Sequence, residues 1–336
     1  MQTNYSLANH NSFGINVNAF LFAAPETTDQ LIAVAEKHDF EKLPFLILGE
    51  GNNLLFTKNF DGIVLNPRLK GIELLSGDSD EVLVKVGAAE NWDHLVDYSI
   101  SHGWYGLENL SLIPGSVGSA PVQNIGAYGV ELKDRFAWLD AWDLSDHKIV
   151  RKYPDDCMFG YRNSIFKTHA PKRYVILYVT FSLNKKPGLN LEYGHVRKEF
   201  LARGGSTPAD LREVIISIRN RKLPDPGEYG NAGSFFKNPV VHLSLLESLR
   251  AGFPDIPFHQ GENNLVKIPA AWLIDKAGWK GIRKGDVGTW PNQPLVIVNY
   301  GGASGQEILD FSEEIRNDVE RKFGIGLERE VEVVGH

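Results

Sequence analysis

Two segments of the chain carry side chains whose types and surroundings could do chemistry. In segment 159–167, Arg162 stands between a tyrosine and an asparagine, where a guanidinium can present a planar fork of donors to an oxyanion. In segment 230–239, Ser234 follows Asn-Ala-Gly and precedes two phenylalanines, which predicts a hydroxyl on a tight bend leading into an apolar strand. Locally, a salt-bridged surface arginine is the more common explanation of the first, and a turn-capping serine is an equally good explanation of the second. No G-x-S-x-G motif surrounds Ser234, so a hydrolase nucleophile is not indicated.

A third segment, near the end of the chain, alternates acidic residues with arginine and valine. Glu328, Glu330 and Glu332 fall at every second position, and in a strand all three carboxylates would share one face. Such a pattern is most often the solvated face of an exposed edge strand. The alternative is that a carboxylate of this set works in a site.

Two glycine-rich segments could bind a phosphate group through the backbone. Segment 48–56 follows an apolar strand, and its two glycines and two asparagines can adopt positive φ and turn N–H groups inward as an anion nest. A tight turn between strands explains it as well. Segment 109–130 has no charged side chain, and 114–129 holds four glycines together with Ser116 and Ser119 as donors. A buried loop that packs two domains together is the alternative there. This second segment does not match the G-x-x-x-x-G-K-[ST] loop or a strand-bound G-x-G-x-x-G.

Helices and strands that would position these residues are readable from caps and periodicity. Thr27 with Gln30, Asn91, Thr207 with Pro208, and Ser304 with Glu307 predict four helix starts, the second helix ending near Gly103 and the last at Gly324. Apolar or alternating runs predict strands at 44–48, 62–65, 82–86, 174–183, 295–298 and 331–334. These elements come in blocks, which favours α+β domains, and the predicted boundaries lie near Pro67 and at 204–206.

Composition limits the classes of function. The 336 residues predict two or three domains, and the net charge of −7 without a lysine- or arginine-rich run argues against nucleic acid or an anionic membrane as partner. The single cysteine, Cys157, cannot form an internal disulfide, and the scattered histidines give no zinc motif, so no metal is predicted. A polar N-terminus and the lack of a long apolar run predict a cytoplasmic protein.

Taken together, the motifs resemble those of the UDP-N-acetylenolpyruvoylglucosamine reductase family, within the vanillyl-alcohol-oxidase-like FAD-binding superfamily. The two glycine-rich segments, the string G-N-A-G-S-F-F-K-N-P at 230–239 and P-A-A-W-L-I-D at 269–275 carry the likeness. It implies an FAD-binding module of two subdomains, 1–67 and 68–203, a substrate-binding α/β domain at 204–324, and a C-terminal strand at 325–336 that returns to the active site. Noncovalent FAD would contact Gly49, Gly51, Asn52, Asn53, Leu54, Pro114, Gly115, Ser116, Gly118, Ser119, Pro121, Asn124, Gly126, Ala127, Tyr128 and Gly129.

The resemblance also implies a reaction. NADPH would reduce the flavin, and flavin N5 would pass the hydride to C3 of UDP-N-acetylglucosamine enolpyruvate, giving UDP-N-acetylmuramate for peptidoglycan. Ser234 would protonate C2, while Arg162 and Glu330 would stabilise the enediolate. Substrate contacts fall on Tyr193, Lys222, Asn238 and Gln293, and the enzyme is expected to be a monomer.

Two other functions are also considered, and two residues of this chain differ from the family pattern. A flavin oxidase of the same superfamily often attaches its flavin through histidine or cysteine, but neither loop has a cysteine and 109–130 has no histidine. A non-catalytic flavin- or sugar-nucleotide-binding module would give no reason for the three catalytic candidates to converge. Trp290 stands where a histidine is often found, and Phe258 where a tyrosine contacts the uridine end.

Overall fold

The computed structural model describes residues 1–37, 43–77 and 80–335, whose contacts divide the chain into two compact units. Unit 1 comprises residues 1–5, 19–50 and 61–219. Unit 2 comprises 6–18, 51–60 and 220–336, so two short N-terminal segments belong with the C-terminal part. The finer division predicted at residues 67, 203 and 324 stays a prediction.

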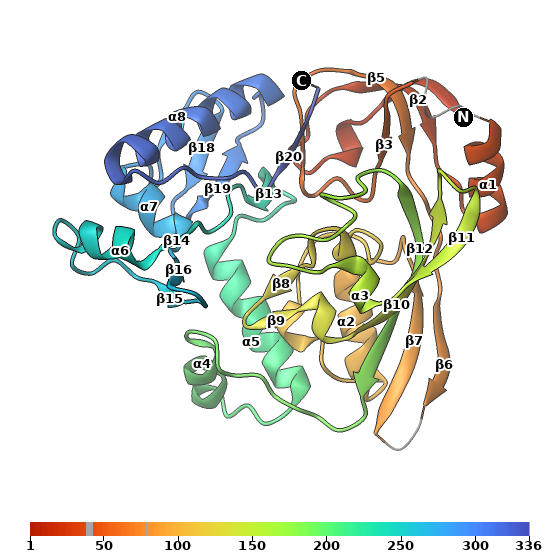
Figure 1. The fold of residues 1–336 in the computed structure, drawn as a ribbon, viewed down its shortest axis with the longest axis horizontal. Helices are drawn as coiled ribbons and strands as arrows, with labels where there is room; N and C mark the ends of the chain where they lie inside the picture. Colours follow the sequence, from red (N-terminus) through yellow and green to blue (C-terminus); the bar gives the residue numbers. More distant parts are fainter. Residues whose placement is uncertain (38–42, 78–79, 336) are drawn as a thin grey trace. The chain divides into compact units, whose positions relative to one another are not determined.

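Unit 1 is built on two sheets (Figure 1). The first has the order β1-β2-β5-β3, with β3 and β5 parallel, and the second is an antiparallel sheet in the order β11-β10-β12-β7-β6. The bounds are β1 Gln2–Ser6, β2 Asn18–Ala23, β3 Phe45–Ile47, β5 Phe60–Leu65, β6 Ile72–Gly77, β7 Glu81–Gly87, β10 Phe136–Asp143, β11 Lys148–Lys152 and β12 Tyr174–Asn184, with a small hairpin of β8 Gly126–Ala127 and β9 Val130–Glu131.

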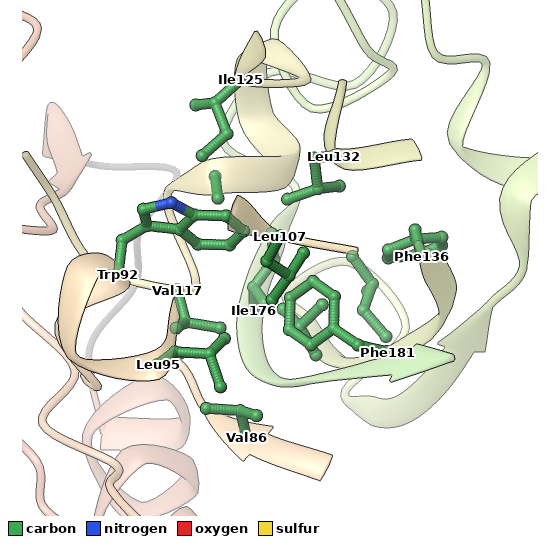
Figure 2. Packing of buried hydrophobic residues seen from close by; sticks show 14 of the residues in the cluster. Val86, Trp92, Leu95, Leu107, Val117, Ile125, Leu132, Phe136, Ile176 and Phe181 are labelled. Carbon is green, nitrogen blue, oxygen red and sulfur yellow. The ribbon is translucent and has the colours of Figure 1, made fainter. Parts of the chain in front are cut away.

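The main core of unit 1 lies between the second sheet and helix α2 (Trp92–Ser101) (Figure 2). Val82, Val84 and Val86 are buried at every second position of β7, as the alternating sequence predicts. On α2, Trp92 is buried and meets the ring of Phe181 edge to face at 5.9 Å. Asn91 begins the helix by accepting a hydrogen bond from His94 N, and Gly103 follows its end at φ +73°. Both predicted ends of this helix are confirmed.

The described part of unit 1 contains further helices. They are α1 Thr28–Lys37, α3 Pro154–Cys157, α4 Val196–Ala202 and α5 Pro208–Lys222, with 3-10 turns at Ala8–His10 (in unit 2), Glu108–Leu110, Ala120–Gln123 and Leu132–Asp134. The predicted caps of α1 and α5 are present, since Thr27 Oγ1 accepts from Gln30 N and Thr207 Oγ1 accepts from Asp210 N. Buried Val196 and Phe200 of α4 pack against the apolar face of α5.

The described part of unit 2 combines several short sheets with the α-helices α6, α7 and α8. Its strand orders are β13-β19-β18-β17, β14-β16-β15 and β20-β4. The bounds are β4 Leu54–Phe56, β13 Gly230–Ser234, β14 Val240–His242, β15 His259–Gln260, β16 Leu265–Lys267, β17 Arg283–Lys284, β18 Val287–Trp290, β19 Gln293–Asn299, β20 Glu332–Val334, α6 Leu243–Arg250, α7 Ala270–Lys276 and α8 Gly305–Phe323. The Ser304–Glu307 capping box opens α8, and Gly324 ends it at φ +66°, both as predicted.

The predicted strands at 44–48, 62–65, 82–86, 174–183 and 295–298 all correspond to strands of the structure, and the α+β fold class is confirmed. The strand predicted at 331–334 is present from Glu332. Among the helices of the described residues, none has the length and apolar character needed to cross a bilayer.

Candidate active site

Within unit 1, the end of β3 faces the start of the uncharged loop. Gly49 lies so close to this loop that an added Cβ would stand 3.0 Å from Ser116 Oγ and 3.4 Å from Ser119 Cβ. Ser119 Oγ donates to the Ser116 carbonyl at 2.7 Å, which fixes this turn. Two hydroxyls therefore lie close to the main chain at Gly49, which has no side chain. This is the arrangement that a phosphate group needs in order to reach main-chain donors.

The same loop is also anchored to the core behind it. Val117 N donates to Glu90 O and Gly118 N donates to Ala88 O, both at 2.8 Å. A Cβ at Gly118 would stand 2.5 Å from the Ala88 Cβ, so this glycine is required by packing. Gly115 adopts φ +129° and its carbonyl accepts from Trp92 N at 2.9 Å. The loop thus packs against the core of unit 1 at Val117 and Gly118 and lies against Gly49 at Ser116, while its contact with a phosphate group stays a prediction.

In unit 2, the residues that follow Gly49 and Glu50 make a tight turn against the N-terminal segment. Gly51 adopts φ +71°, whereas Gly49, Asn52 and Asn53 do not adopt positive φ. A Cβ at Gly51 would fall 2.0 Å from the His10 carbonyl oxygen. The glycine is therefore needed for close approach of two main chains as well as for its φ value.

Arg162 occupies a strained turn beside the predicted cofactor loop. Its φ of +52° is unusual for a residue with a side chain, and Gly160 and Asn163 pair across the turn. Its Nη2 donates to the Gly126 carbonyl at 2.7 Å, and its guanidinium lies 5.5 Å from the ring centre of Tyr161. The turn positions a guanidinium at the end of the uncharged loop, within unit 1.

Asn124 explains part of this placement. Its side chain is fully buried and its Nδ2 donates to Gly160 O at 3.2 Å and to Glu131 Oε2 at 3.0 Å, while its Oδ1 accepts from Lys133 N. The amide therefore ties the Arg162 turn to the β8–β9 hairpin. A contact between Asn124 and the cofactor stays a prediction.

In unit 2, the Ser234 and Glu330 segments run side by side. Ser234 ends β13 opposite Val296 of β19, next to Gly233 at φ +66°. The following residue, Phe235, accepts a hydrogen bond at its carbonyl from Glu330 N at 2.9 Å. Phe236 and Arg329 form a bridge, so the two motifs are adjacent through main-chain hydrogen bonds.

The prediction that the three C-terminal carboxylates share one face is wrong. Glu330 is 9% exposed, whereas the Glu328 side chain is 72% exposed and Glu332 is exposed as well. Regular strand begins only at Glu332, since Arg329 forms an isolated bridge with Phe236 and the chain bends at Glu330 and Val331. One carboxylate of the set is thereby separated from solvent, which a regular edge strand would not do.

The residues predicted to contact substrate are divided between the units. In unit 1, Tyr193 is 48% exposed and meets the Tyr128 ring edge to face at 6.0 Å. In unit 2, Lys222 is exposed at the end of α5, and Gln293 opens β19 opposite Trp290. Asn238 Oδ1 accepts from Ala270 N at 2.9 Å at the start of α7, so its oxygen serves the fold.

Two residues near this part of unit 1 were not predicted. Asn109 Nδ2 donates to the carbonyls of Tyr128 and Asn190, both at 2.9 Å, and so joins the uncharged loop to the Tyr193 segment. Arg219 is a hydrogen-bonding neighbour of Tyr128; burial lowers the pKa of Arg219 and raises the pKa of Tyr128. In the sequence, both look like ordinary loop and helix residues, so no local signal identifies them.

No group of three or more metal-ligating side chains occurs in the part of the chain that the structure describes. The donors near Gly49 are instead main-chain groups and hydroxyls. This set suits a phosphate-bearing organic cofactor.

Comparison with known proteins defines the class first. Residues 20–152 match the FAD binding domain family, and this range contains Gly49, Ser116 and Ser119. The chain is therefore an FAD-dependent oxidoreductase. A crystal structure of UDP-N-acetylenolpyruvylglucosamine reductase from Thermus caldophilus shares the fold, with a TM-score of 0.69 at 24% identity over 98% of this chain and 97% of that one.

Further comparisons define the family. Residues 225–334 match the C-terminal domain of UDP-N-acetylenolpyruvoylglucosamine reductase. Proteins named UDP-N-acetylenolpyruvoylglucosamine reductase are 43% identical in Bacteroides fragilis (99% of this chain, 100% of the relative) and 46% identical in Pseudomonas aeruginosa (98% of each). The chain belongs to the UDP-N-acetylenolpyruvoylglucosamine reductase family, as the sequence motifs predicted.

Proposed function

We propose that this protein uses NADPH to reduce UDP-N-acetylglucosamine enolpyruvate to UDP-N-acetylmuramate, a peptidoglycan precursor. Family membership supports the reaction class. The observation that carries the proposal for the residues is the adjacency of the Ser234 and Glu330 segments through Phe235. A hydroxyl and a largely buried carboxyl are the two groups that this reduction needs at neighbouring places.

FAD fits the residues present, because Gly49 leaves backbone exposed to the Ser116 and Ser119 hydroxyls. By family likeness, we assign the diphosphate to these residues together with Gly115, Gly51, Asn52 and Asn53. When bound, FAD supplies the hydride transfer from NADPH to C3 of the enolpyruvyl ether. The remaining chemistry falls to the side chains of this chain.

Charge stabilisation is the first task of these side chains. Addition of hydride at C3, conjugate to the carboxylate, builds negative charge on the carboxylate oxygens. Arg162 presents a fixed planar cation, because its turn and its bond to the Gly126 carbonyl orient the guanidinium. Glu330 would add a second hydrogen bond to the same oxygens, a role that requires its carboxyl to be protonated. Pre-oriented donors of this kind typically contribute about 10²–10³ in rate each.

Proton delivery is the second task. C2 of the enediolate must receive a proton, and Ser234 holds a hydroxyl at the end of β13 for this purpose. Ser234 is half-buried, and its strand partner Val296 is fully buried. In such a place a serine can protonate a strongly basic carbanion that it could not protonate efficiently in water.

Substrate binding is assigned by family likeness to Tyr193, Lys222, Asn238 and Gln293. Tyr193 is half exposed, and its ring meets that of Tyr128 edge to face. NADPH and the sugar nucleotide would occupy the same space in turn. We further propose a cytoplasmic monomer, in keeping with the single cysteine of the chain.

The test is a two-step titration of the purified protein under anaerobic conditions. A flavin absorption band that NADPH bleaches, and that UDP-N-acetylglucosamine enolpyruvate restores, is the expected result. Acid precipitation should release the flavin into solution. Reoxidation by oxygen alone, with no response to the enolpyruvyl substrate, would instead favour an oxidase. Tight substrate binding without bleaching would favour a non-catalytic module.

A further inference from the structure

Residues 327–332, here named the Glu330 segment, are held in place by hydrogen bonds to other parts of unit 2. Besides the bond from Glu330 N to Phe235 O, Lys237 N donates to Glu328 O at 2.9 Å. Asn53 Nδ2 donates to the Glu330 carbonyl at 3.0 Å. These bonds fix the middle of the segment to the Ser234 motif and to the residue before β4.

Helix α8 holds the beginning of the Glu330 segment through one arginine. Arg316 Nε donates to the Leu327 carbonyl at 3.0 Å. Its Nη1 donates to both carboxylate oxygens of Glu313, at 3.0 and 2.7 Å. Glu313 Oε1 in turn lies 3.1 Å from Nη2 of Arg329, the residue directly before Glu330. Arg316 therefore reaches the segment twice, directly at Leu327 and through Glu313 at Arg329.

The helix is a rigid base for these contacts. Residues on the inner face of α8, including Ile315 and Val319, are fully buried, and both helix ends are capped. Arginine suits the position because a planar guanidinium directs Nε and Nη1 to two partners at fixed angles, which the single nitrogen of lysine cannot do. Arg316 therefore fixes the Glu330 segment relative to helix α8.

Stability alone is a poor explanation of this arrangement. The Arg316 and Glu313 side chains are 34% and 36% exposed, and ion pairs at that exposure contribute little to the free energy of folding. A contact of small energy can nevertheless restrict a neighbouring group to one orientation. The catalytic effect of such restriction is large when a reacting group must lie within a fraction of an ångström.

We propose that Arg316 is a positioning residue that holds the Glu330 carboxyl in place for reduction of the enolpyruvyl substrate. The inference rests on the proposed function of Glu330. Because Glu330 acts on the substrate and has no part in accepting hydride from NADPH, Arg316 should matter for one half-reaction only. Reoxidation of the reduced protein by substrate needs it, and reduction by NADPH does not.

The experiment compares Arg316→Leu with a matched control on the same helix. Arg321 also pairs with an acid three residues earlier, Asp318, but its side chain is 76% exposed and it serves as the control in Arg321→Leu. Both half-reactions are followed by stopped-flow absorbance of the FAD-loaded full chain. Arg316→Leu is expected to slow reoxidation by about 10-fold or more and to leave the NADPH step at the rate of Arg321→Leu.

Two further variants sharpen the result. Arg316→Lys can keep one of the two partners, so it should restore part of the reoxidation rate and serves in place of the leucine variant if that fails to fold. Placed in a Glu330→Gln background, Arg316→Leu should slow reoxidation little further, because the group that it positions is already changed.

Several outcomes would overturn the proposal. They are equal slowing of both half-reactions, behaviour of Arg316→Leu like Arg321→Leu, and a full additional loss in the Glu330→Gln background. Failure of the proposed function itself is distinguishable, because the unmodified protein would then fail to be reduced by NADPH or reoxidised by the substrate.

Discussion

The side-chain amide of Asn53 donates to the main-chain carbonyl of Glu330 at 3.0 Å, although 277 positions separate the two residues. A second hydrogen bond runs the other way, since Glu332 N donates to the Asn53 carbonyl at 3.0 Å. The strand that follows Asn53, β4, pairs in parallel with β20. Continuous hydrogen bonding therefore joins two segments. One is the loop predicted to contact the cofactor, and the other carries the proposed catalytic carboxyl of Glu330. Changes in either should be felt in the other.

Asn53→Asp is expected to destabilise the protein by about 1–3 kcal/mol. The substitution keeps the shape of the side chain but removes the Nδ2 donor and directs a carboxylate oxygen at the Glu330 carbonyl. Urea unfolding monitored by tryptophan fluorescence measures the change. Asn52→Asp adds the same charge one residue earlier and is the control. Equal effects of the two variants would show that the loss comes from charge and not from the Asn53–Glu330 bond.

Ser234→Ala should separate the two half-reactions. The variant is expected to be reduced by NADPH at the normal rate, because that step needs no proton from Ser234. Reoxidation by the enolpyruvyl substrate should fall by at least about 10²-fold, since C2 then has no positioned proton donor. Stopped-flow absorbance at the flavin band follows both steps. A loss of equal size in both would contradict the proposed role.

Gly51→Ala and Gly14→Ala form a pair that separates steric clash from backbone strain. Both glycines have nearly the same φ, +71° and +68°, but a Cβ at Gly51 meets the His10 carbonyl at 2.0 Å, whereas nothing lies within 4 Å of one at Gly14. Gly14→Ala should cost about 1–2 kcal/mol from φ alone. Gly51→Ala should cost more and lower the flavin content, as thermal unfolding and the flavin-to-protein absorbance ratio would show. Similar values for both would mean that the turn yields easily.

Local signals in the sequence account for the elements that were predicted correctly. The ends of α8 follow from Ser304, Glu307 and Gly324, because a capping box and a C-terminal glycine act within a few residues of the ends they fix. The uncharged, small-residue composition of 109–130 likewise indicated close backbone approach, which Gly49 and Ser116 show.

Long-range pairing accounts for what the sequence could not show. Nothing in residues 6–18 indicates that they join unit 2, where the carbonyl of Phe13 approaches Gly230 so closely that a Cβ there would lie 2.5 Å from it. The burial of Glu330 between exposed Glu328 and Glu332 also depends on a partner, the Phe235 carbonyl, far away in the chain. Periodicity describes one element at a time, so it predicted a shared face where a second segment imposes a bend.

Asp93 links α2, α5 and the uncharged loop, and it gives a pH-dependent prediction. Arg212 Nη1 and Nη2 donate to its two oxygens at 2.6 and 2.9 Å, and Leu112 N donates to Oδ1 at 2.5 Å. Burial acts to raise the pKa of Asp93, but the hydrogen bonds from Arg212 and Leu112 outweigh it and hold that pKa below its usual range. The folded protein therefore favours the ionised form of Asp93.

Asp93→Asn is expected to lower the free energy of unfolding by about 1–3 kcal/mol at pH 7. This is less than the cost of breaking a fully buried pair, because 24% of the Asp93 side chain is exposed. A group with a lowered folded pKa stabilises above its unfolded pKa, near pH 4, and loses that contribution as the pH falls through the folded value. The difference in unfolding free energy between the variant and the unmodified protein should thus shrink below about pH 4.

Asp97→Asn is the control, since Asp97 contacts the same arginine with a side chain that is 66% exposed, and it should cost under about 0.5 kcal/mol. A loss for Asp93→Asn that persists unchanged at pH 3 would show that shape, and not charge, is what Asp93 contributes.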